Sequence, residues 1–318
     1  MIDFNKKILF KEKNNDLLTV GEILIDMISE DYNDNFECDT FKRFFGGSPA
    51  NIAINTKRLG INSLIAASVG KDSFGDFLIN KLKEAEIDVK FVNKVNHATS
   101  IVVITKSTGT PIPIFHRAAD YNIEYTSELE LLVKNSKIVH FSCWPISMEP
   151  SRKTIEKIIE VARKENIITC FDPNYHPMIW DKNHDGIKYI KELIGKVDII
   201  KPSEDDAERL FGKDTPEKQI NKFFKLGAKF VIMTLGKDGA IVSNGIEKLY
   251  FNTLATKVAD TTGAGDSFWS GFYAGLIKGY AVKEALELGF AVSAYKLKYV
   301  GAVVKMPKIE EIKEIYNL

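Results

Sequence analysis

Short apolar runs alternate with amphipathic segments along most of this chain. The runs of strand length are LLTVGEILIDMI, SLIAASVG, KIVHFSCW, IITCFDPN, DIIKPS and KFVIMTLG. Between them, apolar residues recur at helical spacing in segments 51–59, 74–87, 151–164 and 185–194. Strands that alternate with helices indicate βαβ units. The pattern therefore predicts an α/β fold with a mostly parallel central sheet that is flanked by helices on both faces.

Two regions break this alternation. DNFECDTFKRFF comes first, and FVNKV, TSIVVITK and PIPIFHRAAD follow later; all are strand-like with no helix between them. The gaps are too short for crossover helices, so antiparallel hairpins are expected. We expect a small β-sheet, from about 33–46 and 88–120, that acts as a lid over the ligand end of the main sheet. An edge extension or a subunit contact is the alternative.

Composition narrows the class of protein. Lys plus Arg equals Asp plus Glu, at 43 each, which disfavours a nucleic-acid binder because such a protein needs a basic surface. No apolar run approaches the roughly 18 residues of a membrane span, and the N-terminus lacks a signal-peptide pattern. Cys38, Cys143 and Cys170 are scattered and indicate neither disulfides nor zinc. With no repeat or linker, 1–318 is expected to be one soluble, cytoplasmic domain that binds neither nucleic acid nor membrane.

The segment DTTGAGDSF, residues 260–268, precedes a predicted helix whose apolar residues recur every four positions. Gly263, Ala264 and Gly265 leave the backbone N–H groups of the helix start uncovered. These groups lie at the positive end of the helix dipole and can bind an anion. Asp266 places a carboxylate beside that site. From this segment alone, Asp266 is either a helix cap or a group that acts on a bound anion.

A second glycine-rich segment, FFGGSPANIAINTKRLG, contains Gly46, Gly47 and Asn51. A glycine-lined hollow beside an amide suits a ligand that is rich in hydroxyls, although a hinge that leads into a helix is the alternative. Asp26, at the end of the first predicted strand, can accept hydrogen bonds from two hydroxyls.

Two further segments hold candidates. Arg117 and Asp120 in FHRAAD end a lid strand, where a solvated ion pair is the alternative. TLGKDGA, residues 234–240, ends a strand in a glycine turn, which by itself indicates only a hairpin.

The order and spacing of these motifs resemble the PfkB (ribokinase-like) family of carbohydrate kinases. GGSPAN, a T-x-G-x-x-G element and DTTGAGD follow one another, and the resemblance extends from about Leu17 to Met306. It implies a ribokinase-like fold with a small β-sheet lid. It also implies an enzyme that transfers the γ-phosphate of ATP to a sugar hydroxyl, with Mg²⁺ bridging the nucleotide phosphates.

The resemblance also implies roles for particular residues. The N–H groups of Gly263, Ala264 and Gly265 would bind charge on the transferred group, and Asp266 would take the proton of the sugar hydroxyl. The sugar would lie against Asp26, Gly46, Gly47, Asn51 and Arg117. The nucleotide would lie over Thr234, Gly236 and Gly239. Asp260 and Thr262 resemble ligands of a monovalent cation, so K⁺ is a further cofactor candidate.

Two positions depart from the family pattern. The usual N-x-x-E motif, which helps to organise magnesium and phosphate, reads Ser203-Glu204-Asp205-Asp206, so Ser203 and Asp206 are assigned to the nucleotide site. The DPN segment ends in His176 where relatives often carry arginine. In 2-keto-3-deoxygluconate kinases that arginine helps to hold an acid group, so its absence favours a neutral sugar.

The whole pattern is most similar to fructokinases. A 5-dehydro-2-deoxygluconokinase or a 2-keto-3-deoxygluconate kinase is an alternative. A non-catalytic sugar-binding regulator on the same fold is an alternative of a different class, and Asp266 with the glycine loop argues against it. The apolar lid segment ITKSTGTPIPIF further predicts a homodimer through the lid, because a small sheet cannot bury such a face alone.

Overall fold

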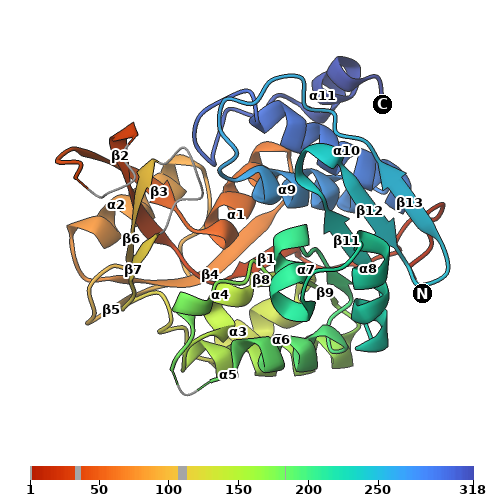
Figure 1. The fold of residues 1–318 in the computed structure, drawn as a ribbon. Helices are drawn as coiled ribbons and strands as arrows, with labels where there is room; N and C mark the ends of the chain where they lie inside the picture. The colour runs from red at the N-terminus through yellow and green to blue at the C-terminus, as the bar shows by residue number, and fades with distance from the viewer. Residues whose placement is uncertain (1, 33–36, 107–112, 183) are drawn as a thin grey trace.

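A computed structural model describes the whole chain except residues 1, 33–36, 107–112 and 183. Within the described part, nine strands form the main sheet in the order β13-β12-β11-β10-β9-β8-β1-β4-β5 (Figure 1). All neighbours pair in parallel except β11 with β12 and β12 with β13. The strands are β1 (Asn15–Val20), β4 (Ser63–Gly70), β5 (Val92–Val95), β8 (Ser136–Ser142), β9 (Ile168–Asp172), β10 (Ile199–Ile200), β11 (Val231–Thr234), β12 (Ala240–Ser243) and β13 (Lys248–Phe251).

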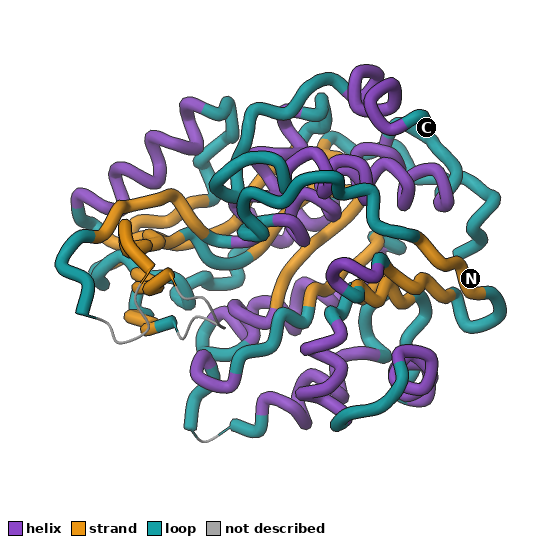
Figure 2. Tube along the Cα trace, turned by 45° about the horizontal axis from the view of Figure 1, so that its top comes forward, coloured by secondary structure: helices purple, strands orange, loops and turns teal. Residues whose placement is uncertain are grey.

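Helices cover both faces of this sheet, as the sequence predicts (Figure 2). One face carries α1 (Ser48–Arg58), α2 (Ser73–Glu84), α9 (Ala264–Ile277), α10 (Val282–Lys296) and, outermost, α11 (Ile309–Tyr316). The other face carries α3 (Ser127–Lys134), α5 (Ser151–Glu165), α6 (Gly186–Ile194), α7 (Glu204–Phe211) and α8 (Pro216–Lys225). Strand alternation divides the core: Leu17 packs towards α9 and Leu18 towards the opposite layer.

A second sheet of four strands stands beside the first, at the left of Figure 1. Its order is β3-β2-β6-β7, from β3 (Phe41–Gly46), β2 (Leu24–Tyr32), β6 (Ile101–Lys106) and β7 (Ile114–His116). The β2–β3 and β6–β7 pairs are antiparallel, but β2 and β6 pair in parallel, so the expectation of hairpins alone is wrong at this central pair. Parts of the expected lid, 33–36 and 107–112, lie outside the described residues.

Two further expectations about strands are wrong. The run LLTVGEILIDMI is two strands, because the chain turns after Val20 and enters the small sheet at Leu24. A Cβ atom at Gly21, in this turn, would lie only 2.8 Å from Pro49 Cγ. Asp26 therefore belongs to a strand of the small sheet and does not end the first strand. The run FVNKV is β5, which pairs with β4 at the edge of the main sheet.

Helices α9 and α10 pack closely along the second half of α9. A Cβ atom at Gly271 would lie 2.7 Å from Val292 Cγ2, and one at Gly275 would lie 2.8 Å from Ala285 Cα. Both glycines therefore allow α10 to lie directly against α9. The short helix α4 (Cys143–Ile146) and the 3₁₀ turns η1 (Pro177–Ile179) and η2 (Gly236–Asp238) complete the elements of the described chain. None of its helices has the length and apolar character needed to cross a membrane.

Candidate active site

The first turns of α1 and α9 meet at the carboxylate of Asp266. Ser48 Oγ donates a hydrogen bond to Asp266 Oδ1 at 2.6 Å, and Asn51 Nδ2 donates to Oδ2 at 2.9 Å. The residue that caps α9 is Gly263, and no side chain caps this helix. Asp266 is therefore not a helix cap. Its carboxylate faces another helix, where two side chains of α1 orient it.

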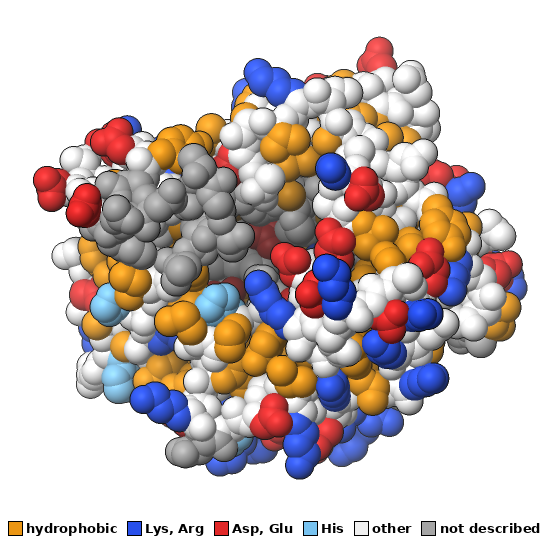
Figure 3. Space-filling view, viewed as in Figure 1, with side chains coloured by type: hydrophobic (Ala, Val, Ile, Leu, Met, Phe, Trp, Pro, Cys, Tyr) orange, Lys and Arg blue, Asp and Glu red, His pale blue; other side chains and the backbone are white. Residues whose placement is uncertain are grey.

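The surroundings of Asp266 suit a group that takes up a proton. Burial raises the pKa of Asp266, the hydrogen bonds from Ser48 and Asn51 oppose the rise, and the charge of Asp172 adds to it. Asp26 lies close enough to interact with it: burial, and then the charge of Asp266, raise the pKa of Asp26 to about 7. A general base works best when its pKa approaches the working pH. Acidic side chains lie around a hollow near the centre of the face in Figure 3.

Unpaired backbone donors surround this carboxylate. Within the described chain, the N–H groups of Gly263, Gly265 and Asp266 make no hydrogen bond. The N–H of Ala264 is different, because it donates to the carbonyl of Thr261 at 3.1 Å. The expectation that Gly263, Ala264 and Gly265 all present free donors is thus wrong for Ala264. The free set is Gly263, Gly265 and Asp266, and it remains a site for an anion.

Gly263 is required by its surroundings. Its φ of +74° is in the left-handed region, and a Cβ atom there would lie 2.6 Å from Ala302 Cα. Only glycine meets both conditions without strain. The loop that leads into α9 is therefore held against the chain near residue 302.

A lysine that sequence reasoning missed lies beside the free donors. Lys201 follows β10; its side chain is almost fully buried, and its Nζ lies 2.9 Å from Asp172 Oδ2. The same Asp172 oxygen accepts a hydrogen bond from Trp269 Nε1 at 2.8 Å. A Cβ atom at Gly265 would lie only 3.4 Å from Lys201 Nζ, so the absence of a side chain there lets the ammonium group approach the start of α9. Its position at the carboxyl end of a strand, in DIIKPS, is the signal that could have identified it.

The glycines near α1 allow two close approaches. A Cβ atom at Gly46 would lie 2.3 Å from Asp26 Oδ2, and one at Gly47 would lie 2.3 Å from the carbonyl oxygen of Glu22. No described residue donates a hydrogen bond to the carboxylate of Asp26. The buried amide oxygen of Asn51 also lacks a partner among the described residues. The structure thus brings Asp26, Gly46, Gly47 and Asn51 together near Asp266, with two acceptors left for a ligand.

Glu22 was also missed, and it supports this loop. Its side chain is buried, and Oε1 accepts a hydrogen bond from the N–H of Ser48 at 3.1 Å. Burial raises the pKa of Glu22 to about 8. The carboxyl group therefore helps to position the first turn of α1, which in turn orients Asp266.

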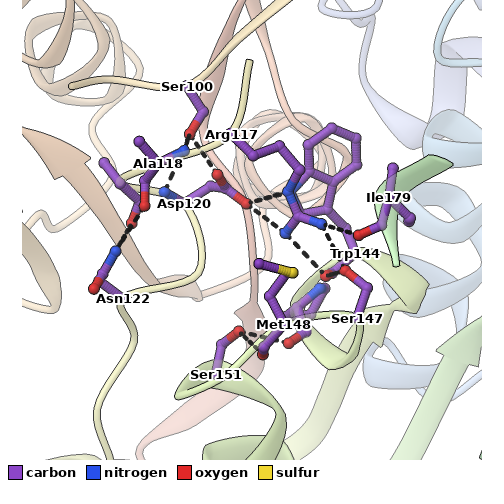
Figure 4. A network of polar contacts seen from close by, with 12 residues as sticks. Ser100, Arg117, Ala118, Asp120, Asn122, Trp144, Ser147, Met148, Ser151 and Ile179 are labelled. Carbon is purple, nitrogen blue, oxygen red and sulfur yellow. Dashed lines mark hydrogen bonds and ion pairs between the residues drawn. The ribbon is translucent and has the colours of Figure 1, made fainter. Parts of the chain in front are cut away.

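Arg117 is placed differently from the expectation. Its five N–H donors all have partners within the protein: Asp120 Oδ2 twice, Ser147 Oγ, and the carbonyl oxygens of Ile179 and Trp144 (Figure 4). Asp120 is fully buried and also accepts a hydrogen bond from Trp144 Nε1 at 2.6 Å. Both interpretations from the sequence are therefore wrong for this geometry: Arg117 has no donor free for a sugar, and its ion pair is not solvated. It connects the end of β7 to the main body.

The nucleotide candidates meet at the carboxyl ends of β10 and β11. Thr234 N donates to the carbonyl of Pro202 at 3.0 Å, next to Ser203. Gly236 and Gly239 form the tight turn between β11 and β12, and a Cβ atom at Gly239 would lie 1.9 Å from Phe251 O. Gly239 is thus required by packing. A Cβ atom at Gly236 would have no neighbour closer than Glu204 Oε1 at 3.9 Å, so the open backbone of this group is at Gly236.

Ser203 and Asp206 form a capping box at the start of α7. Asp206 Oδ2 accepts hydrogen bonds from the N–H and Oγ of Ser203, and Oδ1 accepts one from Tyr175 N at 2.7 Å. Burial, followed by the charge of Asp172, raises the pKa of Asp206. Both oxygens of this carboxylate are thus engaged within the protein. The pair supports the site by fixing α7 and offers no free oxygen pair to a metal.

The described chain contains no cluster of three or more Asp, Glu, His or Cys that could hold a metal ion.

Asp260, a candidate cation ligand, has a different partner. The ammonium group of Lys296 donates a hydrogen bond to the carbonyl oxygen of Asp260 at 2.7 Å. Asp260 Oδ1 accepts a hydrogen bond from the N–H of Thr262 at 2.9 Å. The side chain of Thr262 is exposed, so it does not provide a buried oxygen ligand for a cation.

These features define a phosphoryl-transfer site: an oriented carboxylate, an anion site at a helix start and a buried cation beside it. Residues 14–309 match the pfkB family of carbohydrate kinases, and the chain belongs to this family. It is an ATP-dependent carbohydrate kinase with a ribokinase-like fold, as the resemblance implies.

Three similar proteins carry different names. An ATP-dependent 6-phosphofructokinase of Thermoanaerobacterium thermosaccharolyticum is 65% identical over all of this chain and 99% of its own length. A 5-dehydro-2-deoxygluconokinase of Clostridium perfringens is 31% identical over 98% of this chain and 94% of its own. The structure of fructokinase from Halothermothrix orenii is 39% identical with a TM-score of 0.78, and the match covers 86% of this chain and 97% of that one.

Proposed function

We propose that this protein transfers the γ-phosphate of ATP to fructose 6-phosphate. The observation that carries the proposal is the 65% identity to a 6-phosphofructokinase over the whole of both chains. Identity at this level covers the lid and the sugar side of the site as well as the phosphoryl-transfer loop. The sequence alone favoured fructose, and we now treat fructose as the second candidate. The similarity to a fructokinase structure and the absence of an arginine at His176 support it.

Asp266 acts as the general base in this proposal. The acceptor hydroxyl donates its proton to the carboxylate while its oxygen forms a bond to the γ-phosphorus, and the bond from that phosphorus to the bridging oxygen of ADP breaks. Ser48 and Asn51 hold the carboxylate in one orientation. Burial raises the pKa of Asp266 above its ordinary value, which makes the carboxylate a stronger proton acceptor.

The free N–H groups of Gly263, Gly265 and Asp266 then stabilise the charge on the transferred group. Lys201 adds a positive charge close to Gly265, which suits a transition state whose charge spreads over three oxygens. Mg²⁺ bound to the nucleotide phosphates supplies further neutralisation. Gly236 offers open backbone to the nucleotide, beside Thr234 at the end of β11.

The acceptor binds through Asp26 and Asn51. Asn51 Oδ1 is buried without a partner in the described chain, and no described residue donates to the carboxylate of Asp26, so hydroxyl groups of the sugar can donate to both. Gly46 and Gly47 support this side of the site because they let Asp26 and the backbone of Glu22 approach closely. His176 contacts the small sheet: its ring lies 5.0 Å from that of Phe115, next to Ile114 on β7, and burial lowers the pKa of His176. A neutral imidazole is a weak partner for any anionic group, so this feature disfavours a sugar acid and favours fructose, the second candidate, over fructose 6-phosphate.

We also propose that the small sheet forms a homodimer contact. Tyr32 and Ile114, on two of its strands, expose apolar side chains, and part of the apolar segment 104–115 lies outside the described residues. Sedimentation should find a dimer at micromolar protein; a monomer there would remove this proposal.

The substrate is tested by comparing kcat/KM for fructose 6-phosphate, fructose and 5-dehydro-2-deoxygluconate, each with MgATP and with ADP release as the readout. We expect the highest value for fructose 6-phosphate. A higher value for fructose would assign the chain to the fructokinases. Turnover of neither ketose would contradict both candidates, and the Asp266→Asn variant controls for contaminating kinases.

A further inference from the structure

The loop that supplies the anion-binding N–H groups is held by a buried lysine. Lys296, in the last turn of α10, has no exposed surface. Its Nζ donates a hydrogen bond to the carbonyl oxygen of Asp260 at 2.7 Å and lies 4.0 Å from Asp260 Oδ2. Asp260 opens the segment that reaches Gly263 three residues later. The ammonium group therefore lies directly beneath the phosphoryl-transfer loop.

Further hydrogen bonds of Asp260 and of its neighbour Ala259 stabilise this arrangement. Asp260 Oδ2 accepts a hydrogen bond from the N–H of Gly301 at 2.8 Å, and Oδ1 accepts one from Thr262. Next to it, the N–H of Ala259 donates to the carbonyl of Leu297 at 2.7 Å. The loop, the end of α10 and the chain near residue 301 thus form one cluster with the ammonium group at its centre.

This cluster does not fit the monovalent cation that the family resemblance implies. The carbonyl oxygen of Asp260, which would be a ligand of that ion, already accepts from a charged donor at the length typical of a charge-assisted hydrogen bond. A second cation close to the same oxygen would also lie close to the ammonium group. Two positive charges a few ångströms apart in a buried site repel strongly. The site is therefore unsuited to K⁺.

We propose that Lys296 takes the place of the monovalent cation, so that phosphoryl transfer in this protein does not depend on K⁺. Lys296 is a positioning residue: it orders the segment from Asp260 to Gly263, and that segment places the N–H groups of Gly263 and Gly265. Burying an ammonium group costs free energy that an apolar side chain would avoid. A role in ordering the site accounts for its presence better than a contribution to stability does.

The wild-type protein provides the first test. Activity and melting temperature are measured in KCl and in tetramethylammonium chloride at equal ionic strength, because tetramethylammonium is too large to replace K⁺. We expect neither quantity to respond to K⁺. A several-fold rise in kcat with K⁺, or a rise in melting temperature specific to K⁺, would overturn the proposal. The melting temperature needs no sugar, so this test is independent of the substrate proposed above.

Variants provide the second test. Lys296→Met keeps the apolar stem and removes the charge, and we expect kcat to fall by about 100-fold, as misplacement of catalytic groups by about 1 Å can cause. Lys296→Ala opens the space of the ammonium group, so K⁺ should restore part of the lost kcat while tetramethylammonium should not. Lys283→Met, at an exposed lysine of the same helix, is the matched control and should behave as the parent.

Two outcomes would contradict this expectation. Full activity of Lys296→Met in the absence of K⁺ would show that the charge is not needed. Loss of activity in Lys296→Ala that no monovalent cation relieves would assign Lys296 a packing role. If a variant fails to fold, the response of the wild-type protein to K⁺ still decides the question.

Discussion

Ser48 Oγ donates a hydrogen bond of 2.6 Å to Asp266 Oδ1, although the two residues are 218 positions apart in the chain. Each residue lies in the first turn of a helix, so the positive ends of α1 and α9 both face this carboxylate. The contact joins the N-terminal glycine-rich segment to the C-terminal one. In the proposed mechanism, the C-terminal motif supplies the base, Asp266, and the N-terminal motif orients it through Ser48.

Removing this hydrogen bond should shift the pH dependence of catalysis. The bond from Ser48 lowers the pKa of Asp266, so Ser48→Ala should raise that pKa. A base must be ionised, and the acid limb of the kcat profile should therefore move to higher pH. Ser127→Ala, at the first residue of α3, is the matched control and should leave the profile in place. An unchanged profile in Ser48→Ala would exclude this role.

Asp26 should lower stability when it is ionised. Its pKa is about 7 in the folded protein, well above the ordinary value of an aspartate, so the stability associated with its proton is present at low pH and lost as pH rises through about 7. At about pH 8, Asp26→Asn should unfold at a higher urea concentration than the parent. Its free energy of unfolding should be higher by about 1–3 kcal/mol, and the gain is limited because solvent partly screens this half-buried group. The difference should shrink in acid. Asp31→Asn, exposed on the same strand, should show no such trend; equal curves for parent and Asp26→Asn would contradict the prediction.

Gly279 and Gly263 have similar backbone conformations, so alanine substitutions at the two positions distinguish the effect of backbone strain from that of a steric clash at the site. Gly279 has a φ of +78° and open space around it, whereas a Cβ atom at Gly263 would lie 2.6 Å from Ala302 Cα. Gly279→Ala should cost about 1–2 kcal/mol of stability and leave kcat unchanged. Gly263→Ala should carry the same strain and also lower kcat by roughly 10–100-fold, because the loop must move. Equal kcat in the two variants would show that the loop position is not critical.

Arg117→Ala should act on stability first. It leaves the buried Asp120 without its charge partner, which should lower the free energy of unfolding by about 3–5 kcal/mol in urea titrations. Lys134→Ala breaks an exposed pair with Glu130, which water screens, and should leave the free energy of unfolding nearly unchanged. A variant of Arg117 that is as stable as the parent but has a raised sugar KM would restore the expectation that this side chain contacts the sugar.

The sequence predicts the site best where its residues are contiguous. Asp266 and the glycines before it lie in one motif, and helical spacing after them identifies α9. The position of Lys201 after a predicted strand is a signal in the sequence, but its partner Asp172 lies in another element and could not be assigned from it. Lys296 gives no signal at all, because it acts on Asp260, which lies outside its helix. A lysine in an amphipathic segment gives no sign that its side chain points inwards.

The errors have similar causes. The apolar run through Gly21 is continuous, so periodicity could not show that the chain leaves one sheet for another before Asp26. Arg117 and Asp120 read as an exposed pair because their spacing is local. Their burial depends on acceptors from Trp144, Ser147 and Ile179, which only the folded chain brings together.

The account depends most on Asp266 as the base. Asp266→Asn keeps the size of the side chain and one acceptor for Ser48, and it removes the charge and the basicity. The measurement is kcat with the preferred sugar, together with ATP affinity by titration calorimetry. We predict that kcat falls by roughly 10²–10⁴-fold, the usual contribution of a positioned base, while ATP binds as well as before or more tightly because a negative charge near its γ-phosphate is gone. A folded variant that binds ATP and phosphorylates the sugar within a few-fold of the parent would contradict the account.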